Sequence, residues 1–158
     1  MEEYGYVLIT PYSLFKSRTG GIIGRLLSHA ALELIAVKMY SPSNEMVDAY
    51  IEAVKTGSYS EHNLKLLTNY VNENLRPNNT TLISNRCFVL FFKGPEAVGV
   101  LRRIIGHVTY KPKGNTIRGT YGDYIFRNNE LIYFEPAVLC ASDNQSAKRE
   151  LEVFIEYE

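Results

Sequence analysis

Short runs of β-branched and aromatic residues alternate along this chain with stretches whose apolar residues recur every three or four positions. The short runs predict three strands, at Tyr6–Thr10, Leu32–Tyr40 and Arg86–Phe92. Alternation within the second strand places Leu34 and Ala36 on the same side. The third run is almost continuously apolar, which predicts a central strand covered on both faces.

The stretches with helical spacing predict five helices. Ser43 and Ser60 stand where side chains cap helix N-termini, and Gly106 stands where a glycine ends a helix. Either Ser142 or Asp143 caps the final helix. The predicted helices are Ile22–Ala31, Asn44–Val54, Glu61–Leu75, Glu96–Ile105 and a last one that continues to about Leu151.

The second half of the chain shows weaker periodicity. Val108–Asp123 is rich in Gly, Lys and Thr and predicts a long irregular loop, of a kind that often carries function. A hairpin follows, with a turn at Asn128–Glu130 between short strands at Tyr124–Arg127 and Leu131–Phe134. The tail Glu152–Tyr157 mixes apolar and polar residues and predicts an edge strand.

The order of these elements fits a βαββαβ sandwich of the ferredoxin-like α+β class, in which helices cover an antiparallel sheet. A length of 158 residues with an even composition predicts a single domain over 1–158. Seventeen basic and seventeen acidic side chains balance. No global field would therefore draw the protein to nucleic acid or to an anionic membrane.

The cysteine pattern and the N-terminus bear on the cellular compartment. Cys87 and Cys140 are far apart and lack the spacing of a metal site, so we predict neither a disulfide framework nor a bound metal. The acidic start Met1–Tyr4 lacks the basic segment of a signal peptide, and no apolar run is long enough to span a bilayer. Together with the free thiols, these features predict a cytoplasmic protein.

Three blocks of the sequence carry motifs in a fixed order. The first is YVLITPYSLFKSRTGGIIGRLLSHAALELIAVKM at Tyr6–Met39, the second is FVLFFKGPEAVGVLRRIIG at Phe88–Gly106, and the third is TIRGTY at Thr116–Tyr121. The pieces ASD at 141–143 and AKREL at 147–151 follow. Together they resemble the nucleoside diphosphate kinase family, with its IKPD turn, its TIRG motif and its HGSD segment, over nearly the whole chain.

This resemblance implies an enzyme that moves the γ-phosphoryl group of a nucleoside triphosphate onto an active-site histidine and then onto a nucleoside diphosphate. It also implies that Mg²⁺ accompanies the nucleotide. The implied partners are nucleoside di- and triphosphates. The implied assembly is a cytoplasmic homo-oligomer, a hexamer or smaller.

Part of the family's site is kept, by the same resemblance. Arg102 and Arg118 match phosphate-contacting arginines, and two guanidinium forks can hold a polyphosphate bidentately. Tyr50 matches a family tyrosine near the active-site histidine. Ser142 and Glu150 match residues that support the nucleophile.

Other positions depart from the family pattern. The lysine of the IKPD turn falls on Thr10 and its aspartate on Tyr12, while the ribose-binding asparagine falls on Ala137. Cys140 occupies the position of the family's catalytic histidine and follows an inserted hairpin at about Asn129–Pro136. The resemblance therefore predicts a divergent member that lacks the usual active-site histidine.

Cys140 and the three histidines each allow two interpretations. Cys140 is either a small buried hydrophobe, which we favour, or a nucleophile activated by a helix N-terminus and two arginines. His29, His62 and His107 fit solvent-facing or packing positions. His107 adjoins the loop that carries Arg118, so a role as a displaced phosphoryl acceptor stays open.

Three functions are compatible with this pattern. The favoured one is a protein that binds nucleotide phosphates through Arg102 and Arg118 but is impaired or inactive in phosphohistidine-mediated transfer. The second is an active nucleoside diphosphate kinase, converting ATP and NDP to ADP and NTP, with a site rebuilt on His107 or Cys140. The third is an oligomeric interaction module that binds no nucleotide.

Overall fold

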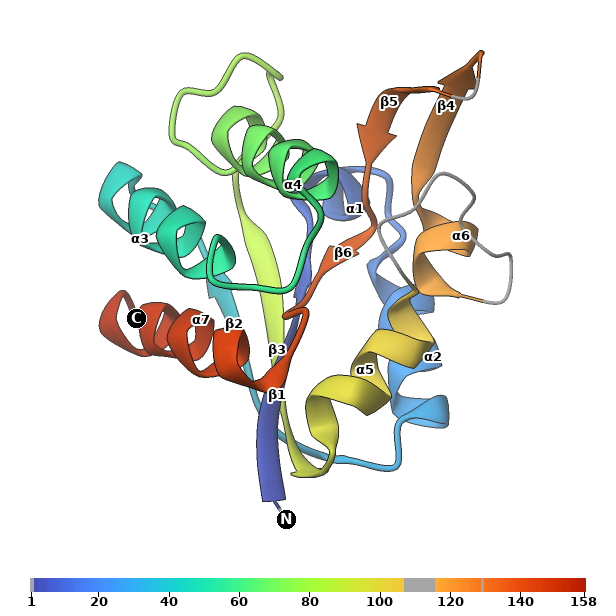
Figure 1. Cartoon of the computed structure of the whole chain (residues 1–158), viewed down its shortest axis with the longest axis vertical. Helices are drawn as coiled ribbons and strands as arrows, with labels where there is room; N and C mark the ends of the chain where they lie inside the picture. The colour runs from blue at the N-terminus through green and yellow to red at the C-terminus, as the bar shows by residue number, and fades with distance from the viewer. Residues whose placement is uncertain (1, 107–115, 129) are drawn as a thin grey trace.

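An antiparallel sheet of four strands lies at the centre of the molecule (Figure 1). This computed structural model describes residues 2–106, 116–128 and 130–158. The strands follow the order β2 (Glu33–Tyr40), β3 (Cys87–Pro95), β1 (Glu2–Ile9) and β6 (Val138–Leu139). Neighbouring strands pair antiparallel, and β3 lies inside the sheet as its apolar sequence predicts.

Seven helices form within the described residues, and their caps follow the sequence. The hydroxyls of Ser43 and Ser60 accept the capping hydrogen bonds of α3 and α4, and the Asp143 carboxylate, rather than Ser142, caps α7. None of the described helices has the length and apolar character to cross a membrane. The helices are α1 (Pro11–Phe15), α2 (Thr19–His29), α3 (Asn44–Val54), α4 (Glu61–Asn74), α5 (Ala97–Ile105), α6 (Ile117–Tyr121) and α7 (Asn144–Glu156).

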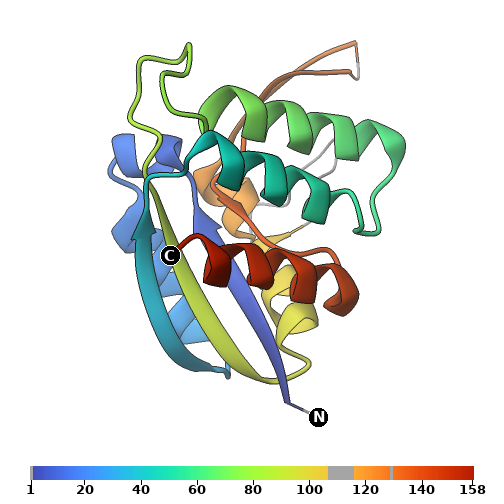
Figure 2. The same cartoon turned by 90° about the vertical axis from the view of Figure 1, so that its left-hand side faces the viewer.

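The helices cover both faces of the sheet, so β1 contributes to two cores (Figure 2). Successive side chains of a strand point to opposite faces. Tyr6 and Leu8 therefore pack with α3, α4 and α7, whereas Val7 and Ile9 pack with α2 and α5. This arrangement confirms the predicted α+β sandwich.

The predicted hairpin is present as β4 (Asp123–Arg127) and β5 (Glu130–Glu135), which form a separate two-stranded sheet. Asn128 adopts a left-handed backbone with φ of 52°, as a tight turn requires. The hairpin projects beyond the central sheet (Figure 1).

Two short helices were not predicted. α1 begins at Pro11, whose fixed φ suits the first helical turn, and Thr10 caps it. α6 lies within the segment 108–123 that the sequence predicts to be an irregular loop, and Thr116 caps this helix. That prediction is therefore wrong for the described part of the segment, because a Thr cap supports a single helical turn there.

The predicted edge strand at Glu152–Tyr157 is also wrong, because α7 continues to Glu156. Ala147, Glu150 and Phe154 recur at helical spacing and are all buried on one face of α7. The mixed apolar and polar residues after Leu151 fit a strand as well as the last turn of a helix, so the sequence did not show that the helix continues. The fourth strand of the sheet is β6 instead.

A bulge in β2 corrects a further prediction. The register shifts between Leu34 and Ala36, so Leu34 lies opposite Phe92 and Ala36 lies opposite Phe91. Phe91 and Phe92 belong to opposite faces of the sheet. Leu34 and Ala36 therefore do not share one side.

Candidate functional site

Cys140 lies in the short connection between β6 and α7 and is 8% exposed. Burial raises the pKa of its thiol, and nearby Glu150 adds to the rise, whereas Arg118 and Arg102 oppose it. The net pKa is raised. Two guanidinium groups from different helices thus act on the same sulfur, and the structure brings together four of the residues selected from the sequence.

The Arg118 side chain is directed from α6 into the interior and is 4% exposed. Its Nη1 donates to the carbonyl of Gly106 at 3.1 Å, and its Nη2 donates to that of Val138 at 3.5 Å. Among the described residues, Nε has no hydrogen-bond partner and no carboxylate forms an ion pair with this guanidinium. A buried cation with an unused donor favours an anion as its partner.

Gly106 allows α5 and α6, which carry Arg102 and Arg118, to lie close together. It ends α5, one turn after the half-buried Arg102, with φ of 93°. A Cβ at this position would lie 2.9 Å from the side chain of Thr116, the cap of α6. Both the backbone conformation and the lack of space therefore require glycine here.

A chain of buried hydroxyls reaches the carboxylate of Glu150. Tyr6 donates a hydrogen bond to Glu150 Oε1, and Tyr50 therefore donates to the Tyr6 hydroxyl at 2.8 Å. Burial raises the pKa of Glu150 to about 7, although the bond from Tyr6 lowers it. Burial also raises the pKa of both tyrosines, so both phenols keep their protons. Tyr50, 3% exposed, is thus placed in the core as part of this chain.

The start of α7 is already saturated with partners from within the chain. Asp143 Oδ1 accepts from the backbone N–H of Ser146 at 2.8 Å. Ser142 Oγ accepts from the backbone N–H of Ser58 at 2.8 Å, and Asp143 Oδ2 accepts from the Ser58 hydroxyl at 2.8 Å. Burial raises the pKa of Asp143, but the bonds from Ser146 and Ser58 outweigh burial and lower it overall.

Tyr59 covers Cys140. This contact was not predicted from the sequence. The Tyr59 hydroxyl donates to the carbonyl of Cys140 at 3.4 Å. Both residues line a cavity of about 10 Å³, with Tyr50 and Leu139 among the other lining residues. That volume holds about one water molecule. A tyrosine in a polar connection carries no periodic signal, so only the folded chain shows this contact.

The positions that depart from the family pattern form structural bonds instead. Thr10 and Ser13 both donate to the carbonyl of Ala137, at 3.1 and 2.8 Å. Tyr12 donates to the carboxylate of Asp123 at the start of β4. These bonds tie α1 to the hairpin and to the segment that leads into β6.

The histidines are not part of this cluster as far as the structure describes them. His29 at the end of α2 and His62 at the start of α4 are exposed, and neither lines the cavity beside Cys140. His107, the candidate displaced acceptor, lies outside the described residues. Its predicted role therefore stays a prediction.

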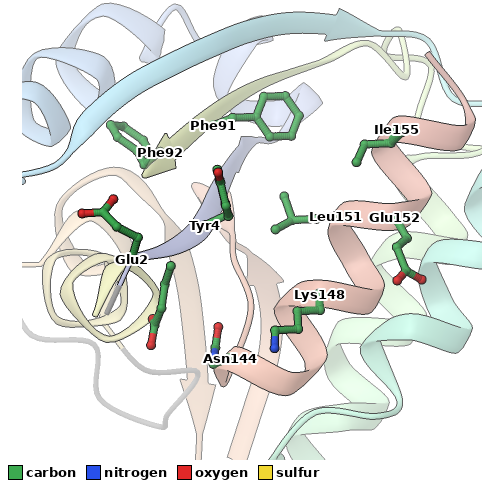
Figure 3. A pocket seen from close by; sticks show the side chains of 11 residues that line it. Glu2, Tyr4, Phe91, Phe92, Asn144, Lys148, Leu151, Glu152 and Ile155 are labelled. Atoms are coloured by element: carbon green, nitrogen blue, oxygen red, sulfur yellow. The ribbon is translucent and has the colours of Figure 1, made fainter. Parts of the chain in front are cut away.

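A larger cavity of about 590 Å³ lies between β1, β3 and α7 (Figure 3). Its charged lining groups are the carboxylates of three glutamates against a single ammonium, which disfavours phosphate. None of the site residues selected from the sequence lines it. Among its lining residues are Glu2, Glu3, Tyr4, Phe91, Lys148 and Glu152.

Comparison with solved structures shows the same fold. A nucleoside diphosphate kinase from Borrelia burgdorferi, a transition-state mimic with bound vanadate and ADP, superimposes with a TM-score of 0.71 at 17% identity. This match covers 97% of the present chain and 86% of that one. An NDP kinase from Pyrobaculum aerophilum has a TM-score of 0.67 at 19% identity, covering 98% and 96% of the two chains.

Sequence comparison extends over the same length. The curated nucleoside diphosphate kinase of Methanocaldococcus jannaschii is 26% identical over 156 residues, which covers 98% of this chain and 94% of the relative. The family model described as nucleoside diphosphate kinase matches residues 3–158. The chain therefore belongs to the nucleoside diphosphate kinase family.

Proposed function

We propose that this protein binds nucleoside di- and triphosphates through Arg102 and Arg118 and is impaired or inactive in phosphohistidine-mediated phosphoryl transfer. The observation that carries the proposal is the buried Arg118 guanidinium, which has an unpartnered Nε and forms no ion pair with the described residues. A phosphate oxygen would supply the missing acceptor. The Borrelia burgdorferi relative was solved with ADP bound, which supports the same ligand class.

The chemistry available at Cys140 supports the impaired half of the proposal. The attacking form of a cysteine is the thiolate, and the raised pKa keeps the Cys140 sulfur protonated at neutral pH. His29 and His62 are exposed and do not line the cavity beside this sulfur. Within the described residues, the site therefore offers binding groups without an efficient phosphoryl acceptor.

Mg²⁺ enters this proposal with the nucleotide. The described residues contain no group of three His, Cys, Asp or Glu side chains that could hold a metal. Mg²⁺ commonly keeps several waters and binds substrate phosphates rather than a protein cage. The two arginines would then neutralise the negative charge of the phosphates that Mg²⁺ does not neutralise.

A thermal-shift experiment with Mg²⁺ and ADP tests the proposal. Binding to the native state must raise the melting temperature, so we expect a rise in the unmodified chain and its loss in Arg102→Ala. Arg103→Ala is the matched control, because Arg103 is the exposed neighbour on the same turn of α5. Absence of any shift in the unmodified chain would refute nucleotide binding and favour the interaction module.

An active kinase with a rebuilt site is distinguished by transfer rather than by binding. If Cys140 or His107 accepts the phosphoryl group, ATP-to-GDP transfer will fall in Cys140→Ser or in His107→Ala. We expect the rate to stay at background in the unmodified chain and in both variants.

The exposed edge of the sheet supports the proposed homo-oligomer. β2 ends the strand order, so one side of its backbone has no strand partner within the described sheet. Apolar side chains remain exposed on this edge strand, which is typical of an interface. They are Leu34, Ile35, Val37 and Met39, between 38% and 54% exposed. We propose that β2 contacts a second copy of the chain.

A further inference from the structure

The connection Lys55–Ser60 between α3 and α4, here named the site lid, is bonded to the start of α7. The backbone N–H of Ser58 donates to Ser142 Oγ at 2.8 Å and to Asp143 Oδ2 at 3.1 Å. The Ser58 hydroxyl adds a third bond to Asp143 Oδ2 at 2.8 Å. One residue of the lid thus holds two residues of another element, 84 and 85 positions away.

The site lid covers one side of Cys140, the residue on which both proposed phosphate-binding arginines act. Tyr59 of the lid contacts Cys140, and Arg118 close to that sulfur is 4% exposed. The cavity between Tyr59 and Cys140, about 10 Å³, has room for about one water and therefore none for a phosphoryl group. A phosphoryl group therefore cannot lie between Tyr59 and Cys140 while the lid stays in place.

Most residues of the lid lie at the surface, although its partners Ser142 and Cys140 are buried. Lys55, Thr56, Ser58 and Ser60 are all exposed, so water competes with the bonds of Ser58. Gly57 packs against Ser142 so closely that a Cβ would lie 2.5 Å from its Oγ. The closed position therefore depends on the close packing of Gly57, on the three bonds of Ser58 and on the bond of Tyr59 to Cys140.

We propose that the site lid is an autoinhibitory latch, which excludes nucleotide phosphates until the bonds of Ser58 to Ser142 and Asp143 break. This inference rests on the proposed nucleotide binding. Because only the open state admits the ligand, the apparent affinity for ADP is reduced by the fraction of molecules that are closed. Weakening the latch raises that affinity.

Alkylation of Cys140 by iodoacetamide measures lid opening without any nucleotide. Gly57→Ala adds the Cβ that meets Ser142, and positive φ is recorded at Gly106 but not at Gly57, so alanine suits its backbone. We expect the alkylation rate of Cys140 to rise about tenfold or more, since labelling of a buried group follows local opening. Gly24→Ala is the matched control, because a Cβ there meets nothing within 4 Å.

Cys87, fully buried in β3, reports global unfolding in the same sample when both cysteines are followed by mass spectrometry. Labelling of Cys140 without Cys87 supports the latch. If Cys140 and Cys87 are labelled at the same rate in Gly57→Ala, the second variant, Asp143→Asn, is measured instead. In this variant, Oδ1 of the asparagine still caps Ser146, while its amide group replaces the oxygen that accepts from Ser58. An unchanged Cys140 rate in folded Gly57→Ala or in this second variant overturns the latch.

Binding of ADP to the same variants separates the latch from the proposed function. Faster alkylation of Cys140 together with tighter ADP binding supports both. Faster alkylation with no ADP binding by any of the chains would overturn the proposed nucleotide binding, and with it the role of the latch in excluding phosphates.

Discussion

Tyr6 donates a hydrogen bond to the carboxylate of Glu150, which lies 144 residues further along the chain and is 1% exposed. The resemblance to the family assigns Glu150 to support of the nucleophile. Here Oε1 of that carboxylate is bonded to a phenol, and the next position in the chain of bonds is Tyr50. The buried acid is therefore held by aromatic residues of the core.

The first prediction concerns the pH dependence of stability. Burial raises the pKa of Glu150 from 4.5 to about 7, so the folded state retains a proton that the unfolded chain releases. The resulting stability is fully present below pH 4.5 and is lost as the pH rises to about 7. Glu150→Gln removes this dependence, so we expect equal stability near pH 4.5 and a gain of up to ~3 kcal/mol at pH 8 in urea unfolding.

Glu135→Gln is the control for this prediction. Burial also raises the pKa of Glu135 to about 7, aided by Asp123 and Glu73, but its side chain is only partly buried. Solvent screening makes its effect smaller. A Glu150→Gln chain less stable than the unmodified chain at pH 8 would contradict the prediction.

Replacing Cys140 by histidine tests the volume of the site. The adjoining cavity is about 10 Å³, too small for an imidazole in place of a thiol. We expect Cys140→His to reduce the free energy of unfolding by about 1–3 kcal/mol through overpacking. Cys140→Ser, which preserves the volume, is the reference in the same urea titration. Equal stability of the two variants would show that the site accepts a larger side chain.

Restoring a lysine at position 10 should be costly. Thr10 is fully buried, caps α1 and donates to the carbonyl of Ala137. A buried ammonium without a counter-charge should cost ~3 kcal/mol or more, so Thr10→Lys is expected to be severely destabilised. Thr10→Val, which loses the hydroxyl alone, should lose about 1–2 kcal/mol. A melting temperature of Thr10→Lys equal to that of the unmodified chain would contradict this prediction.

The exposed edge strand predicts a change in assembly. Val37 on β2 is 48% exposed. A lysine there should oppose pairing of this edge with a second copy, because a charge protects sheet edges from association. We expect a lower molar mass by light scattering for Val37→Lys than for the unmodified chain, and no change for Lys55→Ala on an exposed turn. Identical masses for Val37→Lys and the unmodified chain would place the interface elsewhere.

Local signals account for the elements that were predicted from the sequence. The cap at Ser43 and the apolar spacing after it define the bounds of α3. The same kind of signal is absent for β6, which has two residues, and for α7 beyond Leu151, where apolar and polar residues are mixed. These elements depend on packing against the sheet rather than on local preference.

The candidate site was predictable in part for a similar reason. The resemblance to the family predicted that Arg102, Arg118 and Cys140 lie close together. The bonds of Tyr6 to Glu150 and of Ser58 to Asp143 join residues far apart in the chain, and no local pattern indicates which pairs meet. The fold was therefore easier to predict than the contacts between the residues of its site.

Incubation with γ-labelled ATP and Mg²⁺ tests the central claim most directly. We predict no acid-labile, alkali-stable label on the unmodified chain above the background of Cys140→Ala, under conditions in which ADP raises the melting temperature. Such a label in near-stoichiometric amount would demonstrate a phosphohistidine and contradict the account.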